Sequence, residues 1–259
     1  MAAGNRNRAL LESPAGMRSV IVVPARWAST RFPGKPLAPI AGVSLIRRVY
    51  ERAARSSRAS AVYVATDDER ILGHVADFGG KVVRPEGDFA TGTDRIAAAL
   101  PHIELADGNP FDIIVNVQGD EPLIDIASVD ALIERLEVSP SGIATLACPL
   151  ETDEEFHARD VVKVVTDSVG NALYFSRAAI GSREESRRHI GVYAYRRSAL
   201  ERFVALPQSP LERAESLEQL RALQHGFKIA VLQTAKPHLG VDRPEDVARV
   251  ESELARLHE

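Results

Sequence analysis

Cysteine is nearly absent from this chain of 259 residues, where Cys148 is the single one. One cysteine cannot form an internal disulfide or anchor a thiolate zinc site. Its place at the edge of the apolar stretch 143–147 predicts a small buried side chain. A chain without disulfides suits a reducing compartment, so we expect a cytoplasmic protein. No apolar run approaches the roughly 20 residues that span a bilayer, and no membrane partner is expected.

Several common site motifs are also absent. Gly34-Lys35 is followed by Pro36 and lacks the Walker pattern, no G-x-G-x-x-G follows an apolar run, and G-x-S-x-G does not occur. These absences argue against a Walker-type phosphate loop, a dinucleotide fold and a serine hydrolase. The net charge of −4 gives no general attraction to nucleic acid. The site type that remains is one built from oxygen ligands, in which carboxylates hold a hard divalent cation and the substrate is an anion.

Short apolar runs typical of strands alternate with helical patterns along most of the chain. This alternation predicts an α/β fold with a mostly parallel sheet and helices on both faces. The expected strands are 19–23, 61–65, 81–83, 112–117, 143–147 and 229–232, and the expected helices are 44–55, 69–78, 94–100, 126–137, 197–205, 211–225 and 244–257.

One stretch departs from the alternation. Between about 150 and 200, strand patterns at 161–166, 172–176 and 189–195 lie close together, which predicts a small antiparallel subdomain for the acceptor or a dimer contact. Residues 1–17 are expected to form a disordered tail ahead of a single domain at 18–259.

The loop from Pro24 to Pro36 is the most informative segment. It follows the apolar run 20–23, is too rich in proline and glycine to be helical, and carries Arg26, Arg31 and Lys35. Because ligands bind beyond the carboxyl ends of parallel strands, and a helix start favours anions, this loop is predicted to bind a polyphosphate. The alternative is a solvated basic turn.

Two carboxylates are candidate metal ligands. Asp120 lies just past the predicted strand 112–117, where it would face the ligand crevice, and Asp242 is the candidate second ligand. Mg²⁺ is usually held by one or two carboxylates together with substrate phosphates. Each residue also has a structural interpretation: Asp120 as a turn residue before Pro122, and Asp242 as a helix cap with Glu245.

Ten short motifs follow one another along the chain. They are PARWASTRFPGKPL (24–37), VATD (64–67), TGTDR (91–95), VNVQGDEP (115–122), VKV (162–164), YFSR (174–177), HIGVY (189–193), SPLE (209–212), LEQLR (217–221) and GVD (240–242). In order and approximate spacing this set resembles the 3-deoxy-manno-octulosonate cytidylyltransferase (CMP-Kdo synthetase) family. The resemblance covers nearly everything from Val20 to the C-terminus.

The resemblance implies a Rossmann-like nucleotidyltransferase fold, a homodimer and Mg²⁺-dependent transfer of CMP from CTP to an acidic acceptor, with release of pyrophosphate. The acceptor would be Kdo, in the activation step for lipopolysaccharide. By the same resemblance, the catalytic residues are Arg26, Lys35, Asp120 and Asp242, of which Asp120 and Asp242 bind the metal. The nucleotide would contact Ala25, Arg26, Ser29, Thr30, Lys35, Arg95, Gln118 and Gly119. The acceptor would contact Arg177, His189, Tyr193, Glu215, Glu218 and Gln219.

The acceptor residues also have structural interpretations, since Tyr193 and His189 could belong to the core and the two glutamates to a solvated helix face. The chain further departs from the family at 179–188, where the segment is short and lacks the family's proline. If this segment forms the pocket wall, we expect weak turnover of Kdo and better turnover of a compact phosphonate such as phosphonoformate, with cations from Arg177, Arg183, Arg187 and Arg188. A third hypothesis is a non-catalytic nucleotide-binding regulator, which the complete set of cations and carboxylates disfavours.

Overall fold

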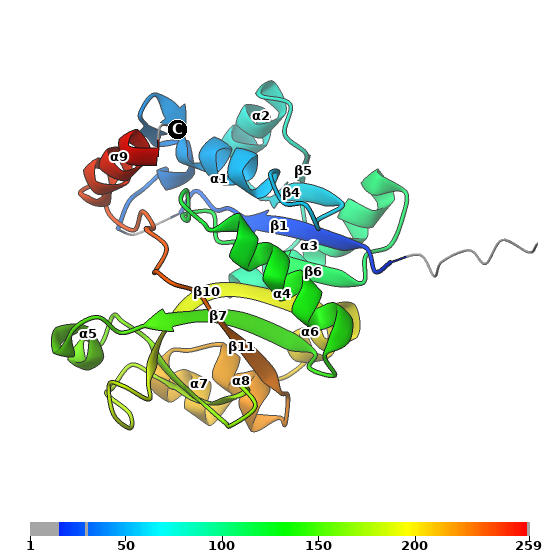
Figure 1. Ribbon diagram of the computed structural model, residues 1–259. Coiled ribbons are helices and arrows are strands. Elements are labelled where there is room, and N and C mark those ends of the chain that lie inside the picture. Colours follow the sequence, from blue (N-terminus) through cyan, green and yellow to red (C-terminus); the bar gives the residue numbers. More distant parts are fainter. Residues whose placement is uncertain (1–15, 29–30, 258–259) are drawn as a thin grey trace, which may run out of the picture.

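In the computed structural model, which describes residues 16–28 and 31–257, the chain folds around one nine-stranded sheet. Its strands are β1 (Ser19–Pro24), β4 (Ala61–Ala65), β5 (Val82–Val83), β6 (Ile113–Asn116), β7 (Ile143–Pro149), β8 (Lys163–Thr166), β9 (Ala172–Ser176), β10 (Arg187–Arg196) and β11 (Ile229–Gln233). The order across the sheet is β11, β7, β10, β6, β1, β4, β5, with β8 pairing with β10 and β9 with β8 (Figure 1). Two short strands, β2 (Pro39–Ile40) and β3 (Val43–Ser44), form a separate antiparallel pair.

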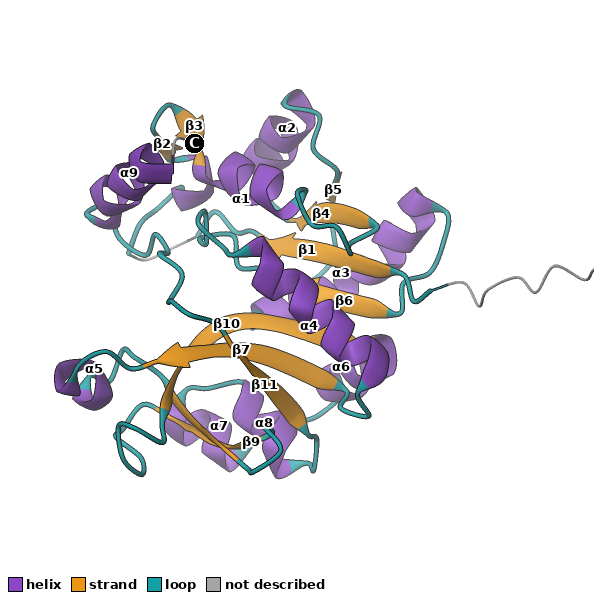
Figure 2. Cartoon of the chain, viewed as in Figure 1, coloured by secondary structure: helices purple, strands orange, loops and turns teal. Residues whose placement is uncertain are grey.

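Helices cover both faces of the sheet, and Figure 2 shows α4 in front of the strands with α3 and α6 behind them. The helices are α1 (Leu45–Ala53), α2 (Glu69–Asp77), α3 (Gly92–Asp107), α4 (Ile126–Val138), α5 (Asp153–His157), α6 (Arg197–Val204), α7 (Pro210–Glu215), α8 (Gln219–Gln224) and α9 (Asp246–Leu257). None of the described helices combines the length and apolar character that crossing a membrane requires.

The strands bury alternate side chains on the two faces. On β1, Ile21 and Val23 pack in one apolar cluster with α1, α2, α4 and α9, whereas Val20 and Val22 pack in another with α3, α6 and α8. A strand buried on both sides needs a continuous apolar run, which is what 20–23 supplies. The predicted α/β fold is therefore confirmed, and so is the burial of Cys148, whose pKa is raised to about 11 by that burial.

Some predicted elements differ from the structure. The helix expected at 211–225 is two helices, α7 and α8, because Ser216 adopts a left-handed conformation with φ 53° and ends the first of them. The helix expected at 94–100 runs through Pro101 to a left-handed Gly108. The β2–β3 pair and α5 were not predicted. Strand β10 lies within the main sheet between β6 and β7, so only β8 and β9 form a small antiparallel extension.

The carboxyl ends of the parallel strands β1, β4 and β6 meet at one edge of the sheet. The backbone N–H of Ala25 donates to the carbonyl of Ala65 at 3.0 Å, so the loop after β1 starts beside the end of β4. Gly119, just after β6, packs so closely that a Cβ there would lie 2.9 Å from the carbonyl oxygen of Pro24. A side chain at 119 would push these two loops apart, and glycine thus keeps the site compact.

Lys163 on β8 carries a fully buried ammonium group. Its Nζ donates to the carbonyl oxygens of Ala158 at 2.7 Å, Val161 at 2.6 Å and Arg177 at 2.8 Å. Burial lowers the pKa of Lys163, and the three hydrogen bonds offset the cost of placing its charge inside the protein. Lys163 therefore fastens the segment before β8 to the end of β9.

We expect Lys163→Met to lower the free energy of unfolding by about 2–4 kcal/mol, because three buried carbonyl oxygens lose their donor. Urea denaturation measures this change. Lys228→Met is the matched control, since Lys228 is exposed and its loss should cost less than about 0.5 kcal/mol. Equal stability of the two variants would contradict the role given to Lys163.

Candidate active site

Lys35 lies between two carboxylates at the edge formed by β1 and β6. It begins a short 3-10 helix directly after Gly34, whose φ of 70° turns the chain back toward the sheet. Its Nζ lies 2.7 Å from Oδ2 of Asp120 and 3.7 Å from Oδ1 of Asp242. The Lys35 side chain is 14% exposed, and solvent screens its pair with Asp120, which is 33% exposed, less than its pair with Asp242, which is 54% exposed. Arg31 adds a second cation, 3.1 Å from Oδ1 of Asp242.

The side chain of Asp242 does not cap α9. The carboxylate that accepts from the backbone N–H groups of Asp242 and Arg243, each at 2.9 Å, is that of Asp246. The Asp242 side chain faces Arg31 and Lys35 instead. Its loop is fixed to the turn after β6 because the N–H of Val241 donates to the carbonyl of Asp120 at 2.9 Å. The helix-cap interpretation of Asp242 is therefore wrong.

Two hollows meet in front of this charged cluster. The first is lined by Pro24, Ala25, Arg26, Arg31, Lys35, Pro36, Gln118, Gly119, Asp120 and Asp242. The second is lined by Pro24, Ala25, Arg26, Phe89, Ala90, Thr91, Gly92, Arg95 and Gln118. Because four residues line both, the hollows form one cleft that runs from the charged cluster to the start of α3. Arg26 sits at the junction and makes no ion pair with any residue that the structure describes.

The far part of the cleft contains a buried arginine. The guanidinium of Arg95 lies 2.9 Å from Oδ1 of Asp67 and 5.1 Å from the centre of the Phe89 ring. The Gln118 side chain, which lines both hollows, donates to Oδ1 of Asn116 at 3.2 Å. No role is predicted for Asp67 from the sequence. Its position could have indicated one, because Asp67 follows the end of β4 as Asp120 follows the end of β6.

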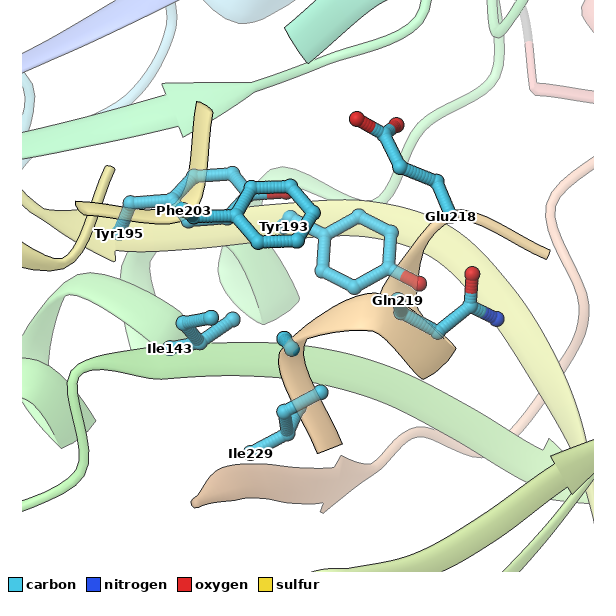
Figure 3. A pocket seen from close by; sticks show the side chains of 8 residues that line it. Ile143, Tyr193, Tyr195, Phe203, Glu218, Gln219 and Ile229 are labelled. Carbon is cyan, nitrogen blue, oxygen red and sulfur yellow. The ribbon is translucent and has the colours of Figure 1, made fainter. Parts of the chain in front are cut away.

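Three of the predicted acceptor residues share a small cavity of their own. Tyr193 from β10 and Glu218 and Gln219 from the start of α8 line it with apolar neighbours (Figure 3). The His189 ring lies 5.4 Å from that of Tyr193, on the same strand. Tyr193 pairs across the sheet with Asn116, so the cavity adjoins the strand that leads to Gln118 and Asp120.

Arg177 and Glu215 are paired with each other. The Glu215 carboxylate accepts from the backbone N–H of Arg177 at 2.9 Å and from the hydroxyl of Ser176 at 3.1 Å. The Arg177 guanidinium in turn donates to the backbone carbonyl of Glu215 at 2.9 Å. In this arrangement both side chains hold the end of β9 against α7. Two predicted nucleotide residues, Ser29 and Thr30, lie outside the described residues.

The donor set fits a hard divalent cation that also binds phosphates. Asp120 and Asp242 both approach Lys35, and within 16–28 and 31–257 no group of three or more His, Cys, Asp and Glu side chains could hold a metal alone. Two carboxylates with remaining ligands from a nucleotide are typical of Mg²⁺. Burial, together with the charges of Asp120 and Asp242, raises the pKa of Glu121 to about 8, so this neighbour is protonated at neutral pH.

Comparison with known proteins gives one consistent family. Residues 20–229 match the family model described as cytidylyltransferase. The 3-deoxy-manno-octulosonate cytidylyltransferase of Syntrophotalea carbinolica is 48% identical over 256 residues, which cover 93% of this chain and 100% of the relative. The 8-amino-3,8-dideoxy-manno-octulosonate cytidylyltransferase of Shewanella sediminis is 47% identical, with 92% of this chain and 99% of the relative covered.

Solved structures agree. A CMP:2-keto-3-deoxy-manno-octonic acid synthetase complexed with CTP matches with a TM-score of 0.85 at 38% identity, covering 93% of this chain and 99% of that chain. A cytidylyltransferase from Leptospira borgpetersenii matches with a TM-score of 0.62 at 22% identity, covering 93% of this chain and 87% of that chain, and shows the fold alone. The predicted Rossmann-like nucleotidyltransferase fold is thus confirmed.

Burial lowers the pKa of His189 to about 3, against about 6.5 in an unfolded chain. Below pH 6.5 the unfolded protein therefore takes up a proton that the folded protein does not. The stability that this neutral imidazole contributes is fully present above pH 6.5 and is lost as the pH falls toward 3. We expect His189→Gln to reduce the fall in unfolding free energy between pH 6.5 and 5, by up to about 1.4 kcal/mol per pH unit. Urea denaturation at several pH values measures the two slopes, and identical slopes would contradict the assignment.

Proposed function

This chain belongs to the cytidylyltransferase family, and we propose that it transfers CMP from CTP to an oxygen of 3-deoxy-manno-octulosonate or its 8-amino analogue, releasing pyrophosphate. The observation that carries the proposal is the meeting of Arg26, Arg31 and Lys35 with Asp120 and Asp242 at one end of the cleft. A triphosphate needs several cations at one end of an elongated site, and a base needs a pocket at the other. The cleft supplies both in that order.

The chemistry needs no nucleophile from the protein. An acceptor oxygen attacks the α-phosphorus of CTP, the bond from that phosphorus to the bridging oxygen of pyrophosphate breaks, and the acceptor's proton leaves to water. Negative charge builds on the transferred group and on the leaving pyrophosphate. Arg26 and Lys35, fixed by the loop after β1, would face this charge and stabilise it more strongly than mobile solvent does.

Asp120 and Asp242 would hold Mg²⁺ in this scheme. When bound, the cation would neutralise phosphate charge and make the pyrophosphate a better leaving group. The two carboxylates come from loops that Val241 and Asp120 join through their backbones. The backbones that carry them are therefore joined before any ligand arrives, which lowers the cost of assembling the site.

The acceptor is best assigned as an eight-carbon sugar acid. Relatives that cover nearly the whole chain are named for two such acids, which differ at carbon 8. A compact phosphonate would need cations beside the site, but the four candidate arginines line neither the cleft nor the cavity that Tyr193, Glu218 and Gln219 share. Arg177 donates to the Glu215 carbonyl, Arg183 pairs with Asp153, Arg187 donates to the Glu184 carbonyl, and Arg188 pairs with Glu155. The complete charged cluster likewise favours an enzyme over a regulator.

The remaining parts of the proposal follow from the family resemblance. We propose a homodimer that acts in the cytoplasm and supplies an activated octulosonate for lipopolysaccharide synthesis. Its partners would be CTP and the acceptor acid, without nucleic acid or membrane.

Pyrophosphate release with CTP and each of three acceptors tests the proposal. We expect release with Kdo, its 8-amino analogue or both, and none above background with phosphonoformate. A pocket that hydrogen-bonds the cytosine amino group should prefer CTP over UTP by about 10²-fold in kcat/KM. Release with phosphonoformate alone would overturn the acceptor assignment, and equal turnover of UTP would overturn the base pocket.

Asp120→Asn and Asp242→Asn should each lower kcat by about 10²-fold or more, because each removes charge from the proposed metal site. The melting temperature should change little, since both side chains are partly exposed. Asp246→Asn is the matched control, because asparagine accepts backbone hydrogen bonds about as well as aspartate does. Unchanged Mg²⁺-dependent kinetics in Asp242→Asn would remove that residue from the site.

A further inference from the structure

The carboxylate of Glu218 joins two parts of the site that are far apart in sequence. One oxygen, Oε1, accepts from the Thr91 hydroxyl at 3.0 Å, and the other, Oε2, accepts from the Thr93 hydroxyl at 3.0 Å. Glu218 stands at the start of α8, whereas both threonines stand at the start of α3. Figure 3 shows the Glu218 carboxylate turned away from the Gln219 amide, although both residues line the same cavity.

The α3 side of this contact borders the proposed nucleotide pocket. Thr91 and Gly92 line that pocket together with Arg95 from the next turn of α3. The Thr91 hydroxyl also accepts from the backbone N–H of Asp94 at 3.1 Å, so the same group caps α3 and donates its one proton to Glu218. Moving Glu218 would therefore move the first turn of α3 and the pocket wall with it.

The α8 side of the contact is rigid. Arg221, one turn further along α8, lies 3.1 Å from Oε2 of Glu212 and 3.3 Å from Oε1 of Glu218. Its guanidinium also donates to the carbonyl of Leu206 at 3.0 Å. Arg221 and Glu212 are both buried, and this ion pair fixes α8 to α7. Glu218 is thus held at its base and presents its carboxylate to α3.

We propose that Glu218 is a positioning residue for the nucleotide, which holds the start of α3 through Thr91 and Thr93 so that the base side of the cleft keeps its shape. The proposal rests on the proposed function of the cleft. It differs from an acceptor-binding role because Glu218 would act on the nucleotide through Thr91 and Thr93 of α3. Hydrogen bonds to a charged carboxylate are strong and directional, so the two from Thr91 and Thr93 can fix the start of α3, which forms the pocket wall.

The test is calorimetric titration of CTP, with no acceptor present, into the wild type, Glu218→Ala, Glu218→Gln and Thr93→Val. We expect Glu218→Ala and Thr93→Val to weaken CTP binding, by about tenfold for the loss of charge-assisted hydrogen bonds. Glu218→Gln should lie between the wild type and Glu218→Ala, because its amide oxygen still accepts one hydroxyl. The double variant Thr93→Val/Glu218→Ala should bind CTP no more weakly than Glu218→Ala, since the two side chains act through one contact.

Thr166→Val, which removes one hydroxyl on β8, is the matched control and should bind CTP as the wild type does. At saturating CTP, the acceptor KM of Thr93→Val should change by less than about threefold. Unchanged CTP affinity in both Thr93→Val and Glu218→Gln would overturn the proposal. This criterion does not depend on Glu218→Ala, so it holds even when that variant fails to fold. An acceptor KM that rises while CTP affinity stays constant would assign Glu218 to the acceptor instead. A wild type that does not bind CTP at all would overturn the proposed function rather than this contact alone.

Discussion

The ion pairs of Lys35 with Asp120 and Asp242 are the interactions on which the arrangement of this site depends. They join three segments that are distant in sequence: the loop after β1, the turn after β6 and the segment before α9. Each segment alone would place one charge at the rim of the sheet. Because the carboxyl ends of β1 and β6 are neighbours, the charges meet at one edge of the sheet, where we propose that a triphosphate and a cation bind.

The rest of the structure limits how far these charges can move. Gly119 lets the turn after β6 lie against Pro24, and the Val241 backbone bond holds the loop of Asp242 to Asp120. Glu121 stays protonated beside the two aspartates, since burial and their charges raise its pKa, and so it adds no third negative charge at neutral pH. Three cations, Arg26, Arg31 and Lys35, therefore face two charged carboxylates, Asp120 and Asp242, and the excess positive charge can stabilise a phosphate.

The sequence predicts that the charges of Lys35 and Asp120 lie at the same edge of the sheet, because the signals for this placement are local. The loop of proline, glycine and three cations directly follows an apolar run, and Asp120 directly follows the most evident buried strand. The Glu218 contact with Thr91 and Thr93 could not be predicted, since it depends on the packing of α8 against α3. The break between α7 and α8 was missed for a similar reason, because a left-handed serine leaves no mark in the helical pattern. The engagement of the arginines near 177–188 with α5 and with backbone carbonyls also follows only from the tertiary fold.

The most direct test of the central claim is to compare the binding of CTP and of cytidine to the wild type and to Lys35→Met by calorimetry. Methionine keeps much of the length of the lysine side chain but removes its charge. If Lys35 faces the triphosphate, CTP should bind at least about tenfold more weakly to the variant, whereas cytidine, which has no phosphate, should bind equally to both proteins. Equal CTP affinity in the two proteins would contradict the account, because the triphosphate would then lie away from Lys35 and its two aspartates.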